Sequence, residues 1–342
     1  MPMNWTSPDH WTKITAIDAH TAGEPLRIIT SGFPELPGDT ILAKRQYAKE
    51  HHDGLRRALM WEPRGHADMY GCIFTEPVTE DGDMGVLFLH NEGFSTMCGH
   101  GIIGMVKVGV ETGLLPKRGP LTEIKIDTPA GRVTATAHMQ GEIVEKVSFL
   151  NVPSFVLEKG LSVEVEGLGE VRYSIAFGGA FYAFVDADAV AVDVYSQKQA
   201  PIAEVGMRIK RAVMDSYVIQ HPHGDPDLNF LYGTIFVKML GDGVHSRNVC
   251  IFAEGEVDRC PTGTGVSARA AIHHAAGELG LNERVTIESL IGTAFDVQVV
   301  EETMVGNLPA VIPEVTGTAY ITGINTLLID PDDPLRDGFI LR

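Results

Sequence analysis

Hydrophobic and polar residues follow two different periods along this chain. Alternation at every second position predicts strand pairs in "ITAIDAHTAGEPLRIIT", "TEIKIDTPAGRVTATAHM" and "VRYSIAFGGAFYAFVDAD", with a glycine in each turn. Apolar residues spaced by three and four predict helices over 37–60, 101–115, about 194–212 and 266–280. Because strands and helices are mixed along the whole length, the pattern predicts an α/β (α+β) fold.

Composition is that of a soluble globular protein. The 342 residues suffice for one large domain or two of ordinary size, and 44% of them are hydrophobic against 21% charged. A net charge of -18 disfavours nucleic acid as a partner, because such a surface repels phosphate. We see no signal-peptide pattern and no apolar run of membrane-spanning length, so we expect a cytoplasmic protein that does not bind membranes. Free thiols are expected for the widely spaced Cys72, Cys98, Cys250 and Cys260.

Two segments of the chain repeat one pattern. "LFLHNEGFSTMCGHGIIGMVKVG" and "CIFAEGEVDRCPTGTGVSARAAI" each contain a strand, Glu-Gly, a short loop, X-Gly-X-Gly and a helix. Aligning the X-Gly-X-Gly cores places Cys98 on Thr262, 164 residues further along, which indicates an internal duplication. Cys260 lies two residues before the equivalent position, so we expect its thiol to point elsewhere and to have a structural role.

Each repeated motif begins a helix at a glycine-rich turn. Such a turn leaves backbone N–H groups free, and the helix dipole adds positive potential there. Two of these turns facing each other would hold a carboxylate. A cysteine at the same helix start would have its thiolate stabilised and could remove a proton next to that carboxylate.

Other motifs in the chain are weaker. "GHGIIG" matches the dinucleotide fingerprint at Gly99, Gly101 and Gly104, but a loop separates it from the preceding strand and the partner turn lacks the third glycine. His221 and His223 have a metal-like spacing without a cysteine or carboxylate set near them, and turn histidines are the simpler interpretation. "HTAGEP", with His20 and Glu24, is a further candidate for the cleft.

With "MCGHG", "DRCPTGTG" and "DAHTAGEPLRII" together, the sequence resembles the proline racemase family over nearly its whole length. The resemblance implies two pseudo-symmetric α/β lobes of the diaminopimelate epimerase type, each a sheet wrapped around a central helix. We place the N-terminal lobe at 1–153, completed by about 320–342, and the C-terminal lobe at 154–319. The family also implies a homodimer and a small imino acid as substrate, with no cofactor and no metal.

The resemblance also implies roles for individual residues. Cys98 would be the base, with Thr262 opposite it. The backbones of Gly99, His100, Gly263 and Thr264 would hold the carboxylate, and Asp258 would meet the ring nitrogen together with the His100 side chain. Racemases and 4-hydroxyproline epimerases of the family have D-R-S-P-C-G-T-G as the second motif, whereas a Cys/Thr pair is similar to that of trans-3-hydroxy-L-proline dehydratases.

The chemistry of a threonine at position 262 also favours the dehydratase. A threonine hydroxyl is far too weak an acid to replace a thiol near neutral pH. A site with one thiol can still remove the α-proton if the carbanion can expel a hydroxyl from the adjacent carbon. Two alternatives stay open: a hydroxyproline epimerase or proline racemase that recruits Cys260 or a water, and an amino-acid binding protein that uses the cleft without catalysis.

Overall fold

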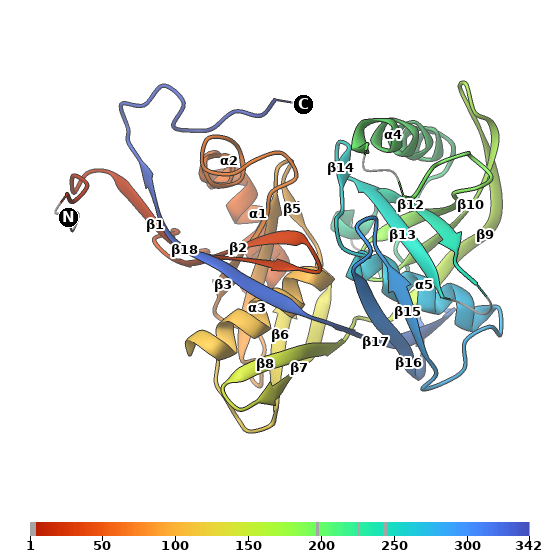
Figure 1. The fold of residues 1–342 in the computed structure, drawn as a ribbon, viewed down its shortest axis with the longest axis horizontal. Coiled ribbons are helices and arrows are strands. Elements are labelled where there is room, and N and C mark those ends of the chain that lie inside the picture. The colour runs from red at the N-terminus through yellow and green to blue at the C-terminus, as the bar shows by residue number, and fades with distance from the viewer. Residues whose placement is uncertain (1–4, 196–197, 225, 242–244, 342) are drawn as a thin grey trace.

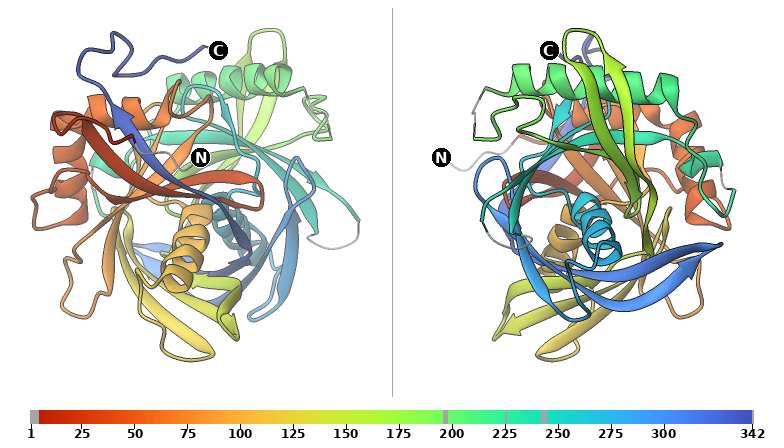
Figure 2. Two further views of the ribbon diagram at one scale, coloured as in Figure 1. Left: turned by 60° about the vertical axis from the view of Figure 1, so that its left-hand side comes forward. Right: turned by 90° about the vertical axis from the view of Figure 1, so that its right-hand side faces the viewer.

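Two halves, each a curved sheet around one helix, make up the molecule (Figure 1). The structure, a computed structural model, describes residues 5–195, 198–224, 226–241 and 245–341. Figure 2 shows the two central helices inside the curved strands and α4 on the outer surface. No helix in the described part of the chain combines the length and apolar character that a membrane crossing requires.

The N-terminal half consists mainly of the first eleven elements. They are β1 (Thr12–Thr21), β2 (Glu24–Ser31), α1 (Ile41–His51), α2 (Asp53–Met60), β3 (Tyr70–Thr75), β4 (Met84–His90), β5 (Phe94–Ser95), α3 (Gly99–Thr112), β6 (Leu121–Thr128), β7 (Gly131–Gln140) and β8 (Ile143–Leu150). The prediction of one helix over 37–60 is wrong, because the chain breaks at His52, whose backbone leaves the helical conformation (φ -129°, ψ 17°). The helix expected at 101–115 is α3, which ends at Gly113 in the left-handed region (φ 78°).

The C-terminal half repeats this arrangement. It contains β9 (Ser154–Val165), β10 (Gly169–Phe177), β11 (Phe181–Asp186), α4 (Gln199–Ser216), the 3-10 helix η1 (Pro226–Leu228), β12 (Leu231–Met239), β13 (Ser246–Phe252), β14 (Glu256–Val257), α5 (Gly263–Ala275), β15 (Arg284–Glu288), β16 (Ala294–Val305) and β17 (Leu308–Gly317). The last strand, β18 (Ala319–Ile329), returns to the N-terminal half. The helix expected over about 194–212 is α4, and residues 196–197 of that range lie outside the described residues.

Parallel strand pairs recur in both halves at matching places. β2 pairs with β3 and β4 with β6 in the first half, as β11 pairs with β12 and β13 with β15 in the second. Helices make these parallel connections, as such crossovers require. The connection by α3 and the connection by α5 are therefore equivalent, in agreement with the repeat seen in the sequence.

One long return strand joins the two sheets. β17 pairs with β16 and β9, which closes the sheet of the C-terminal half, and its last residues pair with β8. β18 then runs antiparallel to β1, at the far side of the N-terminal half (Figure 1). The crossover makes the sheet of each half depend on strands from the other. The lobe boundaries stay a prediction, with 1–153 and about 320–342 in one lobe and 154–319 in the other.

The two central helices are the most deeply buried elements. In α3 every residue from Gly99 to Val110 is buried, and α5 is buried from Gly263 to Ala271. Glycines let each helix pack closely against the strands around it. A Cβ on Gly104 would lie 2.7 Å from a Leu26 methyl carbon, and one on Gly265 would lie 2.4 Å from an Ile235 methyl carbon. The packing fixes the position of both helix N-termini, where the repeated motifs lie.

Candidate active site

The N-termini of α3 and α5 meet at the boundary between the halves. Cys98 is the N-cap of α3, and its sulfur accepts a hydrogen bond from the Gly101 N–H at 3.2 Å. Thr262 precedes α5 with φ 68°, in the left-handed region, where a β-branched residue costs about 1–3 kcal/mol. Its hydroxyl does not cap the helix but donates to Asp258 Oδ2 at 2.7 Å. The Thr262 side chain therefore holds the Asp258 loop and leaves the N–H groups of α5 free of a side-chain cap.

A small cavity lies at this junction. Its volume is about 20 Å³, and its walls are Tyr70, Met97, Cys98, Gly99, His100, Tyr182, Tyr232, Phe252, Asp258, Thr262, Gly263 and Thr264. All the site residues expected from the sequence are in this set. Such a volume holds about one water molecule, so the pocket in this conformation is too small for an amino acid.

Five wall residues were given no role on the basis of the sequence: Tyr70, Met97, Tyr182, Tyr232 and Phe252. Met97 and Phe252 lie within the two repeated segments, and the three tyrosines lie outside them. Most of them lie in strands, so the glycine-rich motifs do not mark them. Tyr70 and Tyr232 lie at equivalent places, at the starts of β3 and β12, whereas Phe252 ends β13. Alternation within those strands could have indicated which face they occupy, but not that this face borders a cavity.

The Cys98 thiol is paired with the His100 imidazole, and Sγ lies 3.2 Å from Nδ1. Burial raises the pKa of Cys98 well above its usual value, and contacts from the Gly101 N–H and Tyr70 only partly oppose it. This corrects the expectation that the helix start would stabilise the thiolate, since the cost of burial is larger. Burial also lowers the pKa of His100 to about 4, although Asp258 and a hydrogen bond with the Pro25 backbone act the other way.

Asp258 organises the loop before α5. Its Oδ1 accepts the Cys260 N–H at 2.9 Å while Oδ2 accepts the Thr262 hydroxyl. The Cys260 sulfur accepts the Thr262 N–H at 3.3 Å, is fully buried and does not line the cavity. These contacts agree with a structural role for Cys260.

A possible metal-binding set exists where none was expected. Ligand atoms of His100, Asp258 and Cys260 lie within 4.8 Å of one another, and these residue types suit zinc. The histidines with H-x-H spacing are elsewhere: the His221 ring packs 4.9 Å from that of Phe177, centroid to centroid. Any metal dependence must therefore be tested at the Asp258 loop.

Glu24 lies behind the cavity rather than in its wall, and His20 stacks on Tyr320, also outside it. The Glu24 carboxylate is fully buried, and its Oε2 accepts the Arg259 N–H at 2.6 Å. Burial, followed by the charge of Asp258, raises the pKa of Glu24 well above its usual value. Glu24 of "HTAGEP" thus supports the Asp258 loop from the other half. Thr21 of the same segment supports the pocket residue His100, since its hydroxyl donates to the His100 carbonyl oxygen at 2.8 Å.

Comparison with known sequences finds relatives along nearly the whole chain. A sequence model of the family described as proline racemase matches residues 16–340. A trans-3-hydroxy-L-proline dehydratase of Colwellia psychrerythraea is 48% identical over 98% of this chain and 94% of its own length. A 3-hydroxyproline 2-epimerase of Burkholderia multivorans is 43% identical over 96% of this chain and 98% of its own. Relatives named for two different activities, a dehydratase and an epimerase, are thus similar to this chain over nearly its whole length.

Comparison with solved structures confirms the expected fold. A hydroxyproline epimerase from Agrobacterium vitis, solved with bound trans-4-hydroxy-L-proline, superposes with a TM-score of 0.92. The match covers 98% of this chain and 96% of that one, at 29% sequence identity. The arrangement of both halves around their central helices is therefore shared with that protein.

Proposed function

This chain belongs to the proline racemase family, and we propose that it is a trans-3-hydroxy-L-proline dehydratase that forms Δ1-pyrroline-2-carboxylate without a cofactor. One observation carries the proposal: the position opposite Cys98 is Thr262, whose hydroxyl is committed to Asp258. A site with a single thiol cannot return a proton to the opposite face of the α-carbon as a pair of thiols does. Elimination of water needs no such second acid.

The helix N-termini supply the carboxylate site in this proposal. The N–H groups of Gly99, His100, Gly263 and Thr264 lie in the first turns of α3 and α5, where no intrahelical acceptor is available. Both dipoles add positive potential at the same point. Asp258, beside the pocket, takes the ring nitrogen of the substrate, with the neutral His100 imidazole next to it. This holds the α-carbon between Cys98 and Thr262.

Cys98 performs both proton transfers. In trans-3-hydroxy-L-proline the α-hydrogen and the 3-hydroxyl are on the same ring face. The Cys98 thiolate takes the α-proton, the electron pair of the C–H bond forms the C2–C3 double bond, and the C3–O bond breaks. The same thiol then gives its proton to the departing hydroxide, so that water leaves and the thiolate is restored. The enamine tautomerises to Δ1-pyrroline-2-carboxylate.

The test is incubation with trans-3-hydroxy-L-proline in deuterated water, followed by proton NMR. Conversion to Δ1-pyrroline-2-carboxylate is expected, and it should persist after chelator treatment. No conversion, with inversion and deuterium at C2 of 4-hydroxyproline instead, would establish the epimerase. In that case the buried Cys260 or a water would have to be the second acid. Binding of imino acids without any turnover would indicate the binding protein.

The role of Cys98 has its own test. Replacing it by serine is expected to abolish turnover, because a hydroxyl cannot supply the base at neutral pH. Cys72→Ala is the matched control: this thiol is also buried, in β3, but lies outside the pocket. Unchanged activity in Cys98→Ser would overturn the mechanism while leaving the product assay valid.

A further inference from the structure

Among the described residues, the Tyr232 hydroxyl is a buried polar atom of the pocket wall with no hydrogen-bond partner. The residue is the second of β12 and is 8% exposed. A buried hydroxyl without a partner is costly, so such groups in a binding site indicate a polar atom of the ligand. The ring itself is firmly placed, stacked on Phe252 with centroids 5.4 Å apart.

The two other tyrosines of the wall differ from Tyr232 in this respect. The Tyr182 hydroxyl is hydrogen-bonded to Thr264 Oγ1 at 2.6 Å, and that of Tyr70 to Ser95 Oγ. Tyr70 lies beside Tyr232, and its side chain opposes the burial that raises the pKa of Tyr232. At hydrogen-bond distance and angle, however, the Tyr232 oxygen has no partner. Of the three tyrosines in the described part of the wall, Tyr232 is therefore the one whose hydroxyl can donate to a molecule in the pocket.

Tyr232 and the proposed base, Cys98, line the same small pocket. Burial is the main reason that its pKa is raised well above the usual value, and the charges of Glu256 and Cys98 act in the same direction. The phenol is consequently protonated throughout the neutral range. It is a hydrogen-bond donor in the wall of the pocket that Cys98 also lines.

We propose that the Tyr232 hydroxyl donates a hydrogen bond to the 3-hydroxyl oxygen of the substrate and so selects substrates that carry this group. The inference rests on the proposed function, in which the α-hydrogen and the 3-hydroxyl face Cys98 together. The proposal places the carboxylate at the helix N-termini and the 3-oxygen against the wall that Tyr232 and Phe252 form. As the C3–O bond breaks, the oxygen gains the electron pair and the hydrogen bond strengthens. Tyr232 keeps its proton, because the proton that completes water comes from the Cys98 thiol.

Tyr232→Phe tests this contact, since it removes the hydroxyl and keeps the ring on Phe252. Two quantities are measured: kcat/KM for dehydration of trans-3-hydroxy-L-proline, and the inhibition constant of L-proline, which lacks the 3-hydroxyl. We expect kcat/KM to fall about 10²-fold while the inhibition constant of L-proline changes less than about twofold. An unchanged kcat/KM would mean that the Tyr232 hydroxyl has no role in the reaction. A fall in kcat/KM matched by an equal rise in the inhibition constant of L-proline would mean that Tyr232 only packs in the wall.

Tyr182→Phe is the matched comparison. Its hydroxyl supports Thr264 at the carboxylate site, so this variant should weaken dehydration and L-proline inhibition together. The wild type separates the two proposals: if it does not dehydrate trans-3-hydroxy-L-proline, the proposed function fails and this inference fails with it. If the wild type dehydrates and Tyr232→Phe does so equally well, only the role of Tyr232 is overturned.

Discussion

Gly99 and Gly263 are in backbone contact, each at the first position of its helix. A Cβ atom on Gly99 would lie 2.6 Å from the Cα of Gly263, and one on Gly263 would lie 2.6 Å from the Cα of Gly99. No real Cβ approaches that closely, so the meeting of the two helix N-termini requires glycine on both sides. The proposed carboxylate site depends on this contact because it brings the free N–H groups of both turns to one point.

Gly263→Ala should therefore separate the two helix starts. We expect kcat/KM to fall about 10²-fold, mostly through a higher KM, because displacing the N–H groups weakens the carboxylate site. Gly54→Ala is the control, a glycine of α2 whose added Cβ would meet no atom within 4 Å. Steady-state kinetics of both variants decide the matter, and normal KM in Gly263→Ala would place the carboxylate elsewhere.

Thr262→Cys should restore a second thiol opposite Cys98. The variant is expected to incorporate deuterium at C2 of proline or 4-hydroxyproline with inversion, measured by NMR and chiral chromatography in deuterated water. The double variant Cys98→Ser/Thr262→Cys should not do so, since the first proton transfer is lost. Absence of inversion in the single variant would show that the site lacks more than a thiol.

Activity should increase with pH on the alkaline side. Burial raises the pKa of Cys98, so the thiolate fraction of the free enzyme is small at neutral pH and grows about tenfold for each pH unit below that pKa. His100, with a pKa of about 4, stays neutral and adds no change between about pH 6 and 9. The profile of kcat/KM over that range checks this, and a plateau already at pH 7 would contradict a raised pKa.

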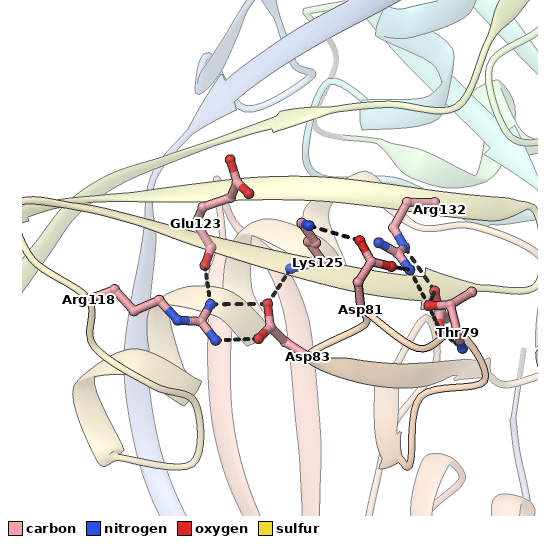
Figure 3. Close-up of polar contacts among 8 residues, drawn as sticks. Thr79, Asp81, Asp83, Arg118, Glu123, Lys125 and Arg132 are labelled. Atoms are coloured by element: carbon pink, nitrogen blue, oxygen red, sulfur yellow. Dashed lines mark hydrogen bonds and ion pairs between the residues drawn. The ribbon is translucent and has the colours of Figure 1, made fainter.

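A polar network on the N-terminal half gives a prediction on stability alone. Figure 3 shows Asp83 facing Arg118 and Asp81 between Lys125 and Arg132. Asp83 is hydrogen-bonded by the Arg118 guanidinium and by the Lys125 N–H at 2.8 Å, and its side chain is 15% exposed. These contacts hold the loop between β3 and β4 against β6.

Asp83→Asn should lower the free energy of unfolding by about 1 kcal/mol at neutral pH without changing kcat. The Arg118 hydrogen bond lowers the pKa of Asp83, so the stabilisation is present above the unfolded pKa of about 3.9 and is lost as pH falls through the lower folded value. Urea unfolding at about pH 7 and about pH 3 should show the variant and wild type converging in acid. Asp81→Asn, on the more exposed carboxylate, should have a smaller effect.

Much of the fold could be predicted because it depends on local periodicity. The alternation in β1, β2, β6 and β7 and the glycine-rich turns between them identify their strand pairs directly. The break at His52 could not be found in this way, since apolar spacing continues through it and the tertiary packing of α1 and α2 decides the direction of each. The return of β18 to β1 joins residues some 300 positions apart, which no local pattern indicates.

The sequence by itself determined the pairing of Cys98 with Thr262, because X-Gly-X-Gly before a helix is a local signal that occurs twice. Only the tertiary structure decided the surroundings of that pair. Burial reversed the expected direction of the Cys98 pKa, since desolvation of a thiolate depends on the atoms packed around it. The aromatic wall with the unpartnered Tyr232 hydroxyl likewise comes from strands of both halves, and it exists only where the two sheets meet.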